Sequence, residues 1–82
     1  MIHKQFTISG IEGPFNIDQF AHMVLSLLKD YKPVWMKVWR GKFTLGIVDL
    51  HAYHHDPSYI SPGSYFTVKS DDFLIIDWAY EK

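Results

Sequence analysis

The sequence predicts an α+β fold, with one α-helix in the N-terminal half packed on a small antiparallel β-sheet of four to five strands. Length is the first reason, because 82 residues suffice for one domain and not for two. The second is a single segment, residues 17–28, whose apolar side chains recur at helical spacing. The third is that much of the remaining chain is β-prone and interrupted by Gly and Pro. One helix against one antiparallel sheet is the simplest assembly of these parts.

The segment before and into the helix contains the clearest local signals. Residues 4–8 alternate polar and apolar side chains, which predicts a strand, and residues 9–14 supply turn-forming residues. Asn16 is a favourable N-cap, and Gln19 stands three residues later as the partner of a capping box. Pro33 is expected to end the helix one or two residues before itself, because the residue preceding a proline disfavours α geometry.

After Pro33 the apolar period changes from 3.6 to 2, which indicates strands. Val34, Met36 and Val38 are expected to face one side, and Trp35, Lys37 and Trp39 the other. Gly46 indicates a bulge or the close approach of another backbone. The remaining predictions are a turn at Arg40-Gly41, strands at 42–52 and 64–68, a loop at 54–63, and a tail at 70–82 that fits either a strand or a helical turn.

Composition excludes several classes of protein. A chain that is 48% hydrophobic and 17% aromatic is not disordered, and its large apolar side chains favour an oligomer or a ring-lined ligand site. The absence of Cys excludes disulfides and thiolate metal sites. A net charge of −1 argues against binding a nucleic-acid polymer, although it leaves small anionic ligands possible. No signal peptide or apolar run of membrane-spanning length is visible, so we expect a cytoplasmic protein.

Candidate catalytic and metal-binding groups are weak in this chain. The run His51-x-x-His54-His55-Asp56 has the residue types of a metal site, but on a strand His54 would face away from His51 and His55. The better interpretation of this run is a polar segment at the entrance of a loop, together with Tyr53 and Tyr59. The adjacent Asp71 and Asp72 fit the capping of a turn rather than acid–base chemistry. Because no phosphate loop or nucleophile elbow is present, the sequence predicts no catalytic residue, metal or cofactor.

The strand face that carries Trp35, Lys37 and Trp39 mixes rings with a cation, so it is not a plain core face. Rings stack on bases and cations bind phosphates, which suits a nucleotide-like ligand. The same composition suits a protein-interface hot spot. The residues alone leave both interpretations open.

Two blocks of this sequence resemble the second Thoeris anti-defence family of phage proteins. The family pattern runs Ala-Leu-x-x-Leu-Lys-x-Gly-Lys-x-Val-x-Arg-x-x-Trp-x-Gly-Lys and closes with Asp-x-Leu-x-x-Asp-Trp. Here the first block begins Val24-Leu25-x-x-Leu28-Lys29 and ends Trp39-Arg40-Gly41-Lys42, and the second reads Asp72-Phe73-Leu74-Ile75-Ile76-Asp77-Trp78. Met36 stands where the family has Arg, and residues 54–69 carry His and Tyr where the family has a longer segment with Pro-Trp.

The resemblance implies a non-enzymatic sponge, a small α+β subunit of a homo-oligomer, described as a tetramer, that acts in the host cytoplasm. Such proteins sequester cyclic ADP-ribose-type or cyclic dinucleotide immune signals. A small protein that inhibits a host defence enzyme is the alternative. Residues 1–14 would then be an N-terminal extension of a single domain spanning 1–82. The ligand-binding residues implied here are Trp39, Arg40, Lys42, Phe43 and Asp72, with His54, Tyr59 and Tyr65 in the segment that differs.

Overall fold

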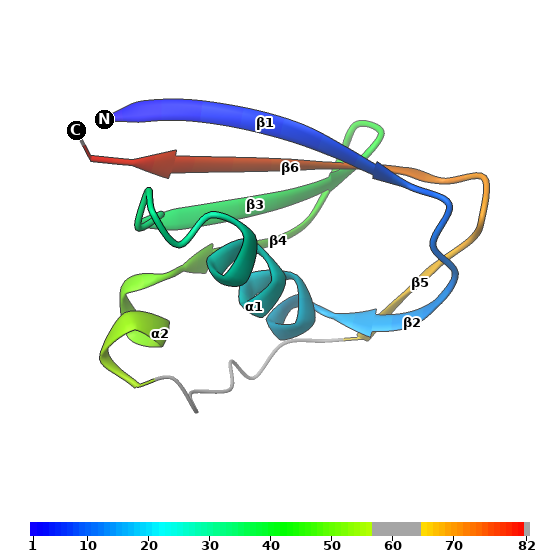
Figure 1. Ribbon diagram of the computed structural model, residues 1–82. Coiled ribbons are helices and arrows are strands. Elements are labelled where there is room, and N and C mark those ends of the chain that lie inside the picture. Colours follow the sequence, from blue (N-terminus) through cyan, green and yellow to red (C-terminus); the bar gives the residue numbers. More distant parts are fainter. Residues whose placement is uncertain (57–64, 82) are drawn as a thin grey trace.

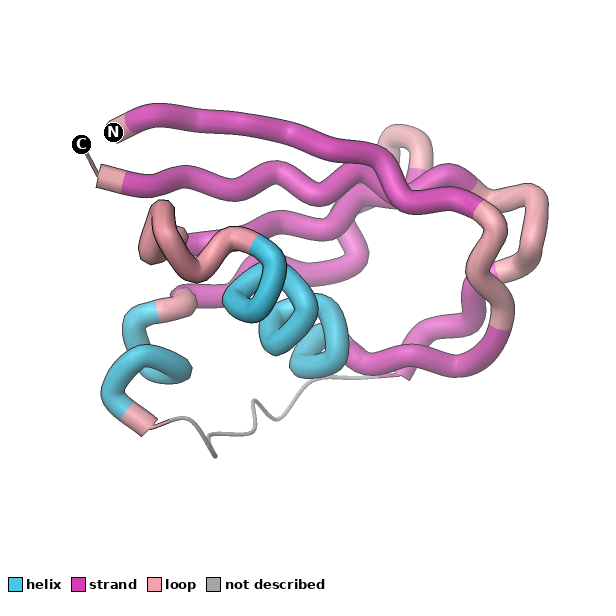
Figure 2. Tube along the Cα trace, viewed as in Figure 1, coloured by secondary structure: helices cyan, strands magenta, loops and turns pink. Residues whose placement is uncertain are grey.

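The computed structural model describes residues 1–56 and 65–81. Its elements are β1 (Ile2–Ser9), β2 (Gly13–Asn16), α1 (Ile17–Leu27), β3 (Trp35–Arg40), β4 (Phe43–Asp49), α2 (His51–His55), β5 (Tyr65–Val68) and β6 (Phe73–Tyr80) (Figure 1). An antiparallel sheet has the strand order β1-β6-β3-β4, and β2 pairs with β5 in a second, two-stranded sheet (Figure 2). The expected helix on a four-stranded antiparallel sheet is therefore confirmed, and the second sheet was not predicted.

The start of α1 forms as its local sequence indicates. The Asn16 side chain accepts a hydrogen bond from the Gln19 backbone N–H at 3.1 Å, and the Gln19 side chain accepts one from the Asn16 N–H at 2.7 Å. The predicted capping box is thus complete. The end of α1 was predicted too late, because the helix stops at Leu27. A tight turn follows it, in which Lys32 takes a φ of 51° and reverses the chain before Pro33.

Two segments differ from the sequence prediction. The predicted turn at 9–14 contains the beginning of β2, which pairs with β5, more than fifty residues later (Phe15 opposite Phe66). The predicted strand at 42–52 ends at Asp49 and continues as α2. Asp49 Oδ1 accepts the His51 N–H at 2.9 Å, and Leu50 is fully buried, so the chain turns out of the sheet at this point.

The core lies between α1 and one face of the four-stranded sheet. Met36 and Val38 on β3 and Leu74 and Ile76 on β6 are fully buried against it, as the period of two predicts for β3. The ambiguous tail contains a strand, β6 (Phe73–Tyr80), which is central in the sheet, between β1 and β3. Burying such side chains stabilises the fold by about 1.5–3 kcal/mol each. No helix in the described part of the chain has the length and apolar character needed to cross a membrane.

Gly46 on β4 lies close to Ile17, the first residue of α1. The β3–β4 register shifts beside it, between Val38 and Trp39, and a Cβ at position 46 would lie 2.8 Å from Ile17 Cδ1 and 3.1 Å from Ile17 Cγ1. The bulge that the sequence indicated is therefore confirmed, and the group that approaches Gly46 is the Ile17 side chain rather than another backbone.

We expect Gly46→Ala to lower the free energy of unfolding by about 1–2 kcal/mol, because Ile17 must shift in a packed core. Adding Ile17→Val, which removes Cδ1, should relieve part of that cost, so the double variant should lose less stability than the sum of the single variants. Equilibrium urea unfolding of the three variants measures this coupling. Strictly additive losses would contradict a clash between these two positions.

Candidate binding face

The four-stranded sheet has a second face that points away from α1, which we call the open face. Its side chains follow from the strand register: His3 and Gln5 on β1, Trp35, Lys37 and Trp39 on β3, Ile47 on β4, and Phe73, Ile75 and Asp77 on β6. Ile47 is 66% exposed, which shows that no described element covers this part of the sheet. The mixed character expected for the β3 face is confirmed.

Trp35 is the centre of one half of the open face. The His3 ring meets it edge-on with centroids 5.2 Å apart, and Lys37 Nζ lies 5.4 Å from the centroid of its ring. These residues and Asp77 line a shallow depression of about 470 Å³. A half-buried ring beside an ammonium group combines a stacking surface with a cation for phosphate.

Trp39 occupies the other half of the open face. Its Nε1–H donates a 2.7 Å hydrogen bond to Asp77 Oδ2, a contact between the two blocks that carry the family resemblance. The bond holds the indole in one orientation and leaves the second carboxylate oxygen of Asp77 as an acceptor for a hydroxyl or amino group. Trp39 is half-buried, so its ring is positioned by the sheet rather than loosely exposed.

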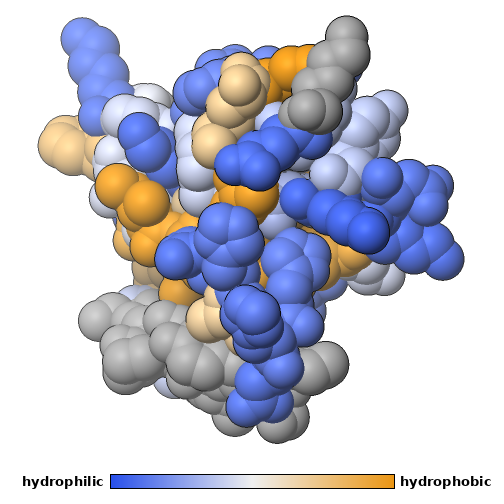
Figure 3. Space-filling model, turned by 90° about the vertical axis from the view of Figure 1, so that its left-hand side faces the viewer, coloured by the Kyte–Doolittle hydropathy of each residue, from blue (hydrophilic) through white to orange (hydrophobic). Residues whose placement is uncertain are grey.

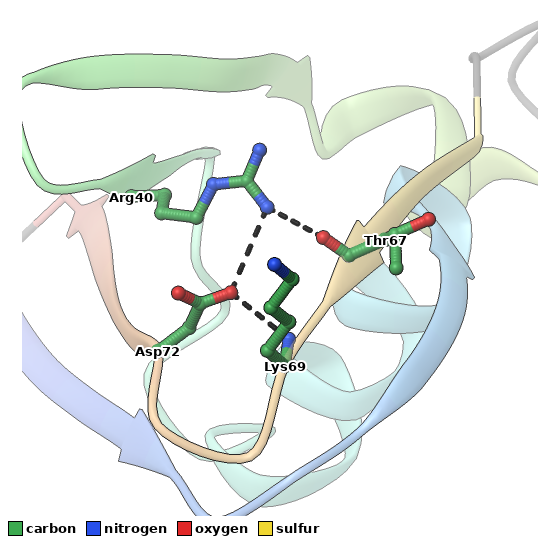
Figure 4. Close-up of polar contacts among 4 residues, drawn as sticks. All are labelled: Arg40, Thr67, Lys69 and Asp72. Atoms are coloured by element: carbon green, nitrogen blue, oxygen red, sulfur yellow. Dashed lines mark hydrogen bonds and ion pairs between the residues drawn. The ribbon is translucent and has the colours of Figure 1, made fainter.

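Arg40 and Asp72 bind each other (Figure 4). Arg40 Nη1 lies 3.8 Å from Asp72 Oδ2 and donates to the Thr67 carbonyl oxygen on β5, while Asp72 Oδ2 accepts the Lys69 N–H at 2.9 Å. The set joins the end of β3 to the turn between β5 and β6. Because adjacent residues of a strand point to opposite faces, Arg40 lies on the side away from the open face. Asp72 caps a turn, which agrees with the interpretation of Asp71-Asp72.

The other residues assigned to ligand binding are dispersed. Lys42 and Phe43 are exposed at the β3–β4 turn, where Phe43 is 76% exposed. Tyr65 is 72% exposed on β5, in the second sheet. His54 Nε2 lies 2.9 Å from the Pro33 carbonyl oxygen, and Pro33 is roughly 20 Å from Trp39 along an extended segment. Tyr59 lies outside the described residues.

The sequence-based ligand set omitted Trp35, Lys37, Asp77 and His3, which the sheet brings beside one another. The period-2 pattern already placed Trp35 and Lys37 on the same strand face as Trp39, so the sequence was sufficient to include these two residues in the ligand set. Asp77 was visible only as part of a motif. His3 could not be placed, because its position depends on β1 pairing with β6 across most of the chain.

The histidine-rich segment forms the helix α2 rather than the end of a strand. The expectation that His54 faces away from His51 and His55 assumed a strand, so it does not apply here. His51 Nδ1 lies 3.2 Å from Asp49 Oδ1, and His54 contacts Pro33 instead of its neighbours. Within residues 1–56 and 65–81, no three His, Asp or Glu side chains are grouped so that they could hold a metal ion.

Comparisons of this chain with protein-family models, curated proteins and solved structures give no significant match.

Proposed function

We propose that this protein is a non-enzymatic phage anti-defence sponge that binds a nucleotide-derived immune signal, of the cyclic ADP-ribose or cyclic dinucleotide type, on its open face. The observation that carries the proposal is the row of Trp35, Lys37 and Trp39 on an uncovered sheet face, with both rings oriented by neighbours. Base stacking is tolerant of base identity and contributes about 1–3 kcal/mol per base. Sequestration needs no catalytic group.

Each part of such a ligand has a suitable group on the open face. The indoles offer stacking surfaces, the Lys37 ammonium offers a charge for phosphate, and Asp77 offers an acceptor for a ribose hydroxyl. The resemblance of residues 24–42 and 72–78 to the anti-defence family supports the same ligand class. The Trp39–Asp77 hydrogen bond joins these two blocks in space.

The proposal includes a homo-oligomer, in the host cytoplasm. Ile47 and Phe73 are exposed at 66% and 65% on the open face, and a second subunit would bury them and shield the ligand from water. Native mass spectrometry reports the subunit number together with the mass of any ligand.

We expect the purified protein to retain an intact nucleotide from a panel of cyclic ADP-ribose isomers and cyclic dinucleotides. After removal of unbound ligand, heating should release the nucleotide unchanged, and the bound protein should melt at a higher temperature by mass action. Chromatography of the released fraction and a thermal melt provide the two readouts. No retained nucleotide and an unchanged melting temperature across the panel would reject this function.

The second candidate is a protein-binding inhibitor of a host defence enzyme. It is favoured by the large exposed side chains Phe43, Ile47 and Phe73, together with β4 as an unpaired edge of the four-stranded sheet in the described chain. This function predicts a stable complex with a host protein in a pull-down and no retained nucleotide.

A further inference from the structure

A second concave site lies between α1 and α2, on the helix side of the sheet. It is an open depression of about 450 Å³, and its lining residues are His22, Leu25, Ser26, Lys29, Lys32, Tyr53 and His54. Figure 3 shows this side of the molecule, where hydrophilic side chains gather around small apolar areas. The volume is within the range of small-molecule sites, about 300–1,000 Å³.

The ionisable groups of this α1–α2 groove are basic. Two lysines and two histidines line it, and no described lining residue is an Asp or Glu. This is unexpected for a chain with a formal net charge of −1. Acidic groups lie beside the groove: Asp30 and Glu81 line the adjoining depression, which also includes Lys32, His51 and His54. The groove therefore places the two ammonium groups of Lys29 and Lys32 beside two imidazoles, a grouping that the composition alone does not suggest.

Local geometry places these groups together. His22, Ser26 and Lys29 are spaced by four and three residues, so they follow one side of α1 and its exit. Lys32 follows the helix in a chain reversal, where its φ is 51°, and it also lines the groove. The negative end of the α1 dipole lies at this exit, and the positive charges of Lys29 and Lys32 offset it.

The two histidines are held by specific contacts. The His22 ring meets the Tyr53 ring edge-on with centroids 5.2 Å apart, and Tyr53 is anchored through its hydroxyl to Asp18. His54 Nε2 lies 2.9 Å from the Pro33 carbonyl oxygen, and because a carbonyl only accepts, Nε2 carries the proton. In this tautomer His54 Nδ1 is an acceptor, which suits a hydroxyl or amino group of a ligand.

We propose that the α1–α2 groove binds a small phosphate-bearing anion, such as a nucleoside phosphate, through Lys29, Lys32, His22 and His54. Lysine ammonium groups and the Ser26 hydroxyl suit phosphate oxygens, and the concave shape suits a small molecule better than a protein surface. This site is separate from the open face and goes beyond the proposed function, because it requires neither Trp35 nor Trp39.

Titration of the isotope-labelled protein with inorganic pyrophosphate tests the site by amide chemical shifts. Saturable shifts are expected at residues 22–32 and 51–54, while the indole N–H resonance of Trp39 on the open face stays in place. No saturable shift, or shifts confined to the open face, would overturn the proposal. Loss of nucleotide binding on the open face would leave this result unchanged, so the two proposals fail separately.

Three variants that each remove one lysine charge compare the groove with a surface site elsewhere. Lys29→Gln and Lys32→Asn should each weaken pyrophosphate binding about three- to fivefold, as expected for exposed charge pairs. Asn is chosen at position 32 because it tolerates positive φ. Lys69→Gln removes an exposed cation from the β5–β6 turn and should leave the affinity unchanged. An equal loss in Lys69→Gln would mean nonspecific charge attraction and would reject the site.

Discussion

Trp39→Ala is expected to weaken binding of the retained nucleotide by about 5- to 150-fold, the equivalent of one base stack. The ring lies on the open face beside Ile75 and Thr44 in the strand register, and its hydrogen bond to Asp77 fixes its orientation. The variant also leaves Asp77 without that donor, so some stability is lost as well. Isothermal titration with the ligand identified from the panel measures the affinity, and circular dichroism checks the fold.

Two further variants separate stacking from general destabilisation. Trp39→Phe keeps a ring but removes the donor, so it should retain most of the affinity that Trp39→Ala loses. Tyr31→Ala removes a ring that packs on Trp78 and Tyr80, away from the open face, and should leave the affinity unchanged. If Trp39→Ala binds with native affinity, Trp39 does not belong to the site.

Tyr53→Phe is expected to lower the free energy of unfolding by about 1–3 kcal/mol, although the substitution removes only the hydroxyl group. The Tyr53 hydroxyl donates to Asp18 Oδ1, and the two residues are 2% and 6% exposed. A buried carboxylate that loses a donor is costly, and this loss is large for a domain of 82 residues. Urea unfolding followed by fluorescence gives the change in stability.

Tyr65→Phe is the matched control, because it deletes the same hydroxyl from a residue that is 72% exposed. Its stability should stay within about 0.5 kcal/mol of the native protein. Asp18→Asn combined with Tyr53→Phe completes a double-mutant cycle, and a coupling of at least about 0.5 kcal/mol is expected between groups in contact. Equal effects of the two tyrosine substitutions would show that the contact between α1 and α2 contributes nothing specific.

The parts of the fold that were predicted correctly depend on neighbouring residues. Asn16 and Gln19 are three residues apart, so their capping box is visible in the sequence and forms as expected. Parts that were missed depend on distant partners. The pairing of β2 with β5 joins segments about fifty residues apart, and no local pattern encodes it. The transition from β4 to α2 combines a local hydrogen bond from the His51 N–H to Asp49 with the burial of Leu50, which depends on other segments.

The same division holds for the candidate sites. Alternation along β3 was enough to place Trp35, Lys37 and Trp39 on one face, because strand geometry repeats every two residues. Whether Arg40 and Asp72 serve a ligand could not be read from their spacing, and in the folded chain they contact each other.

By itself, the sequence determined the start of α1 with its cap, the two faces of β3, and the α+β class, since each of these follows from periodicity and local hydrogen bonding. Only the tertiary structure decided that Trp39 meets Asp77, that His54 lies near Pro33 far from Trp39, and that basic side chains gather between α1 and α2. Those contacts join segments that are far apart in the chain, and their register is set by the burial of the shared core.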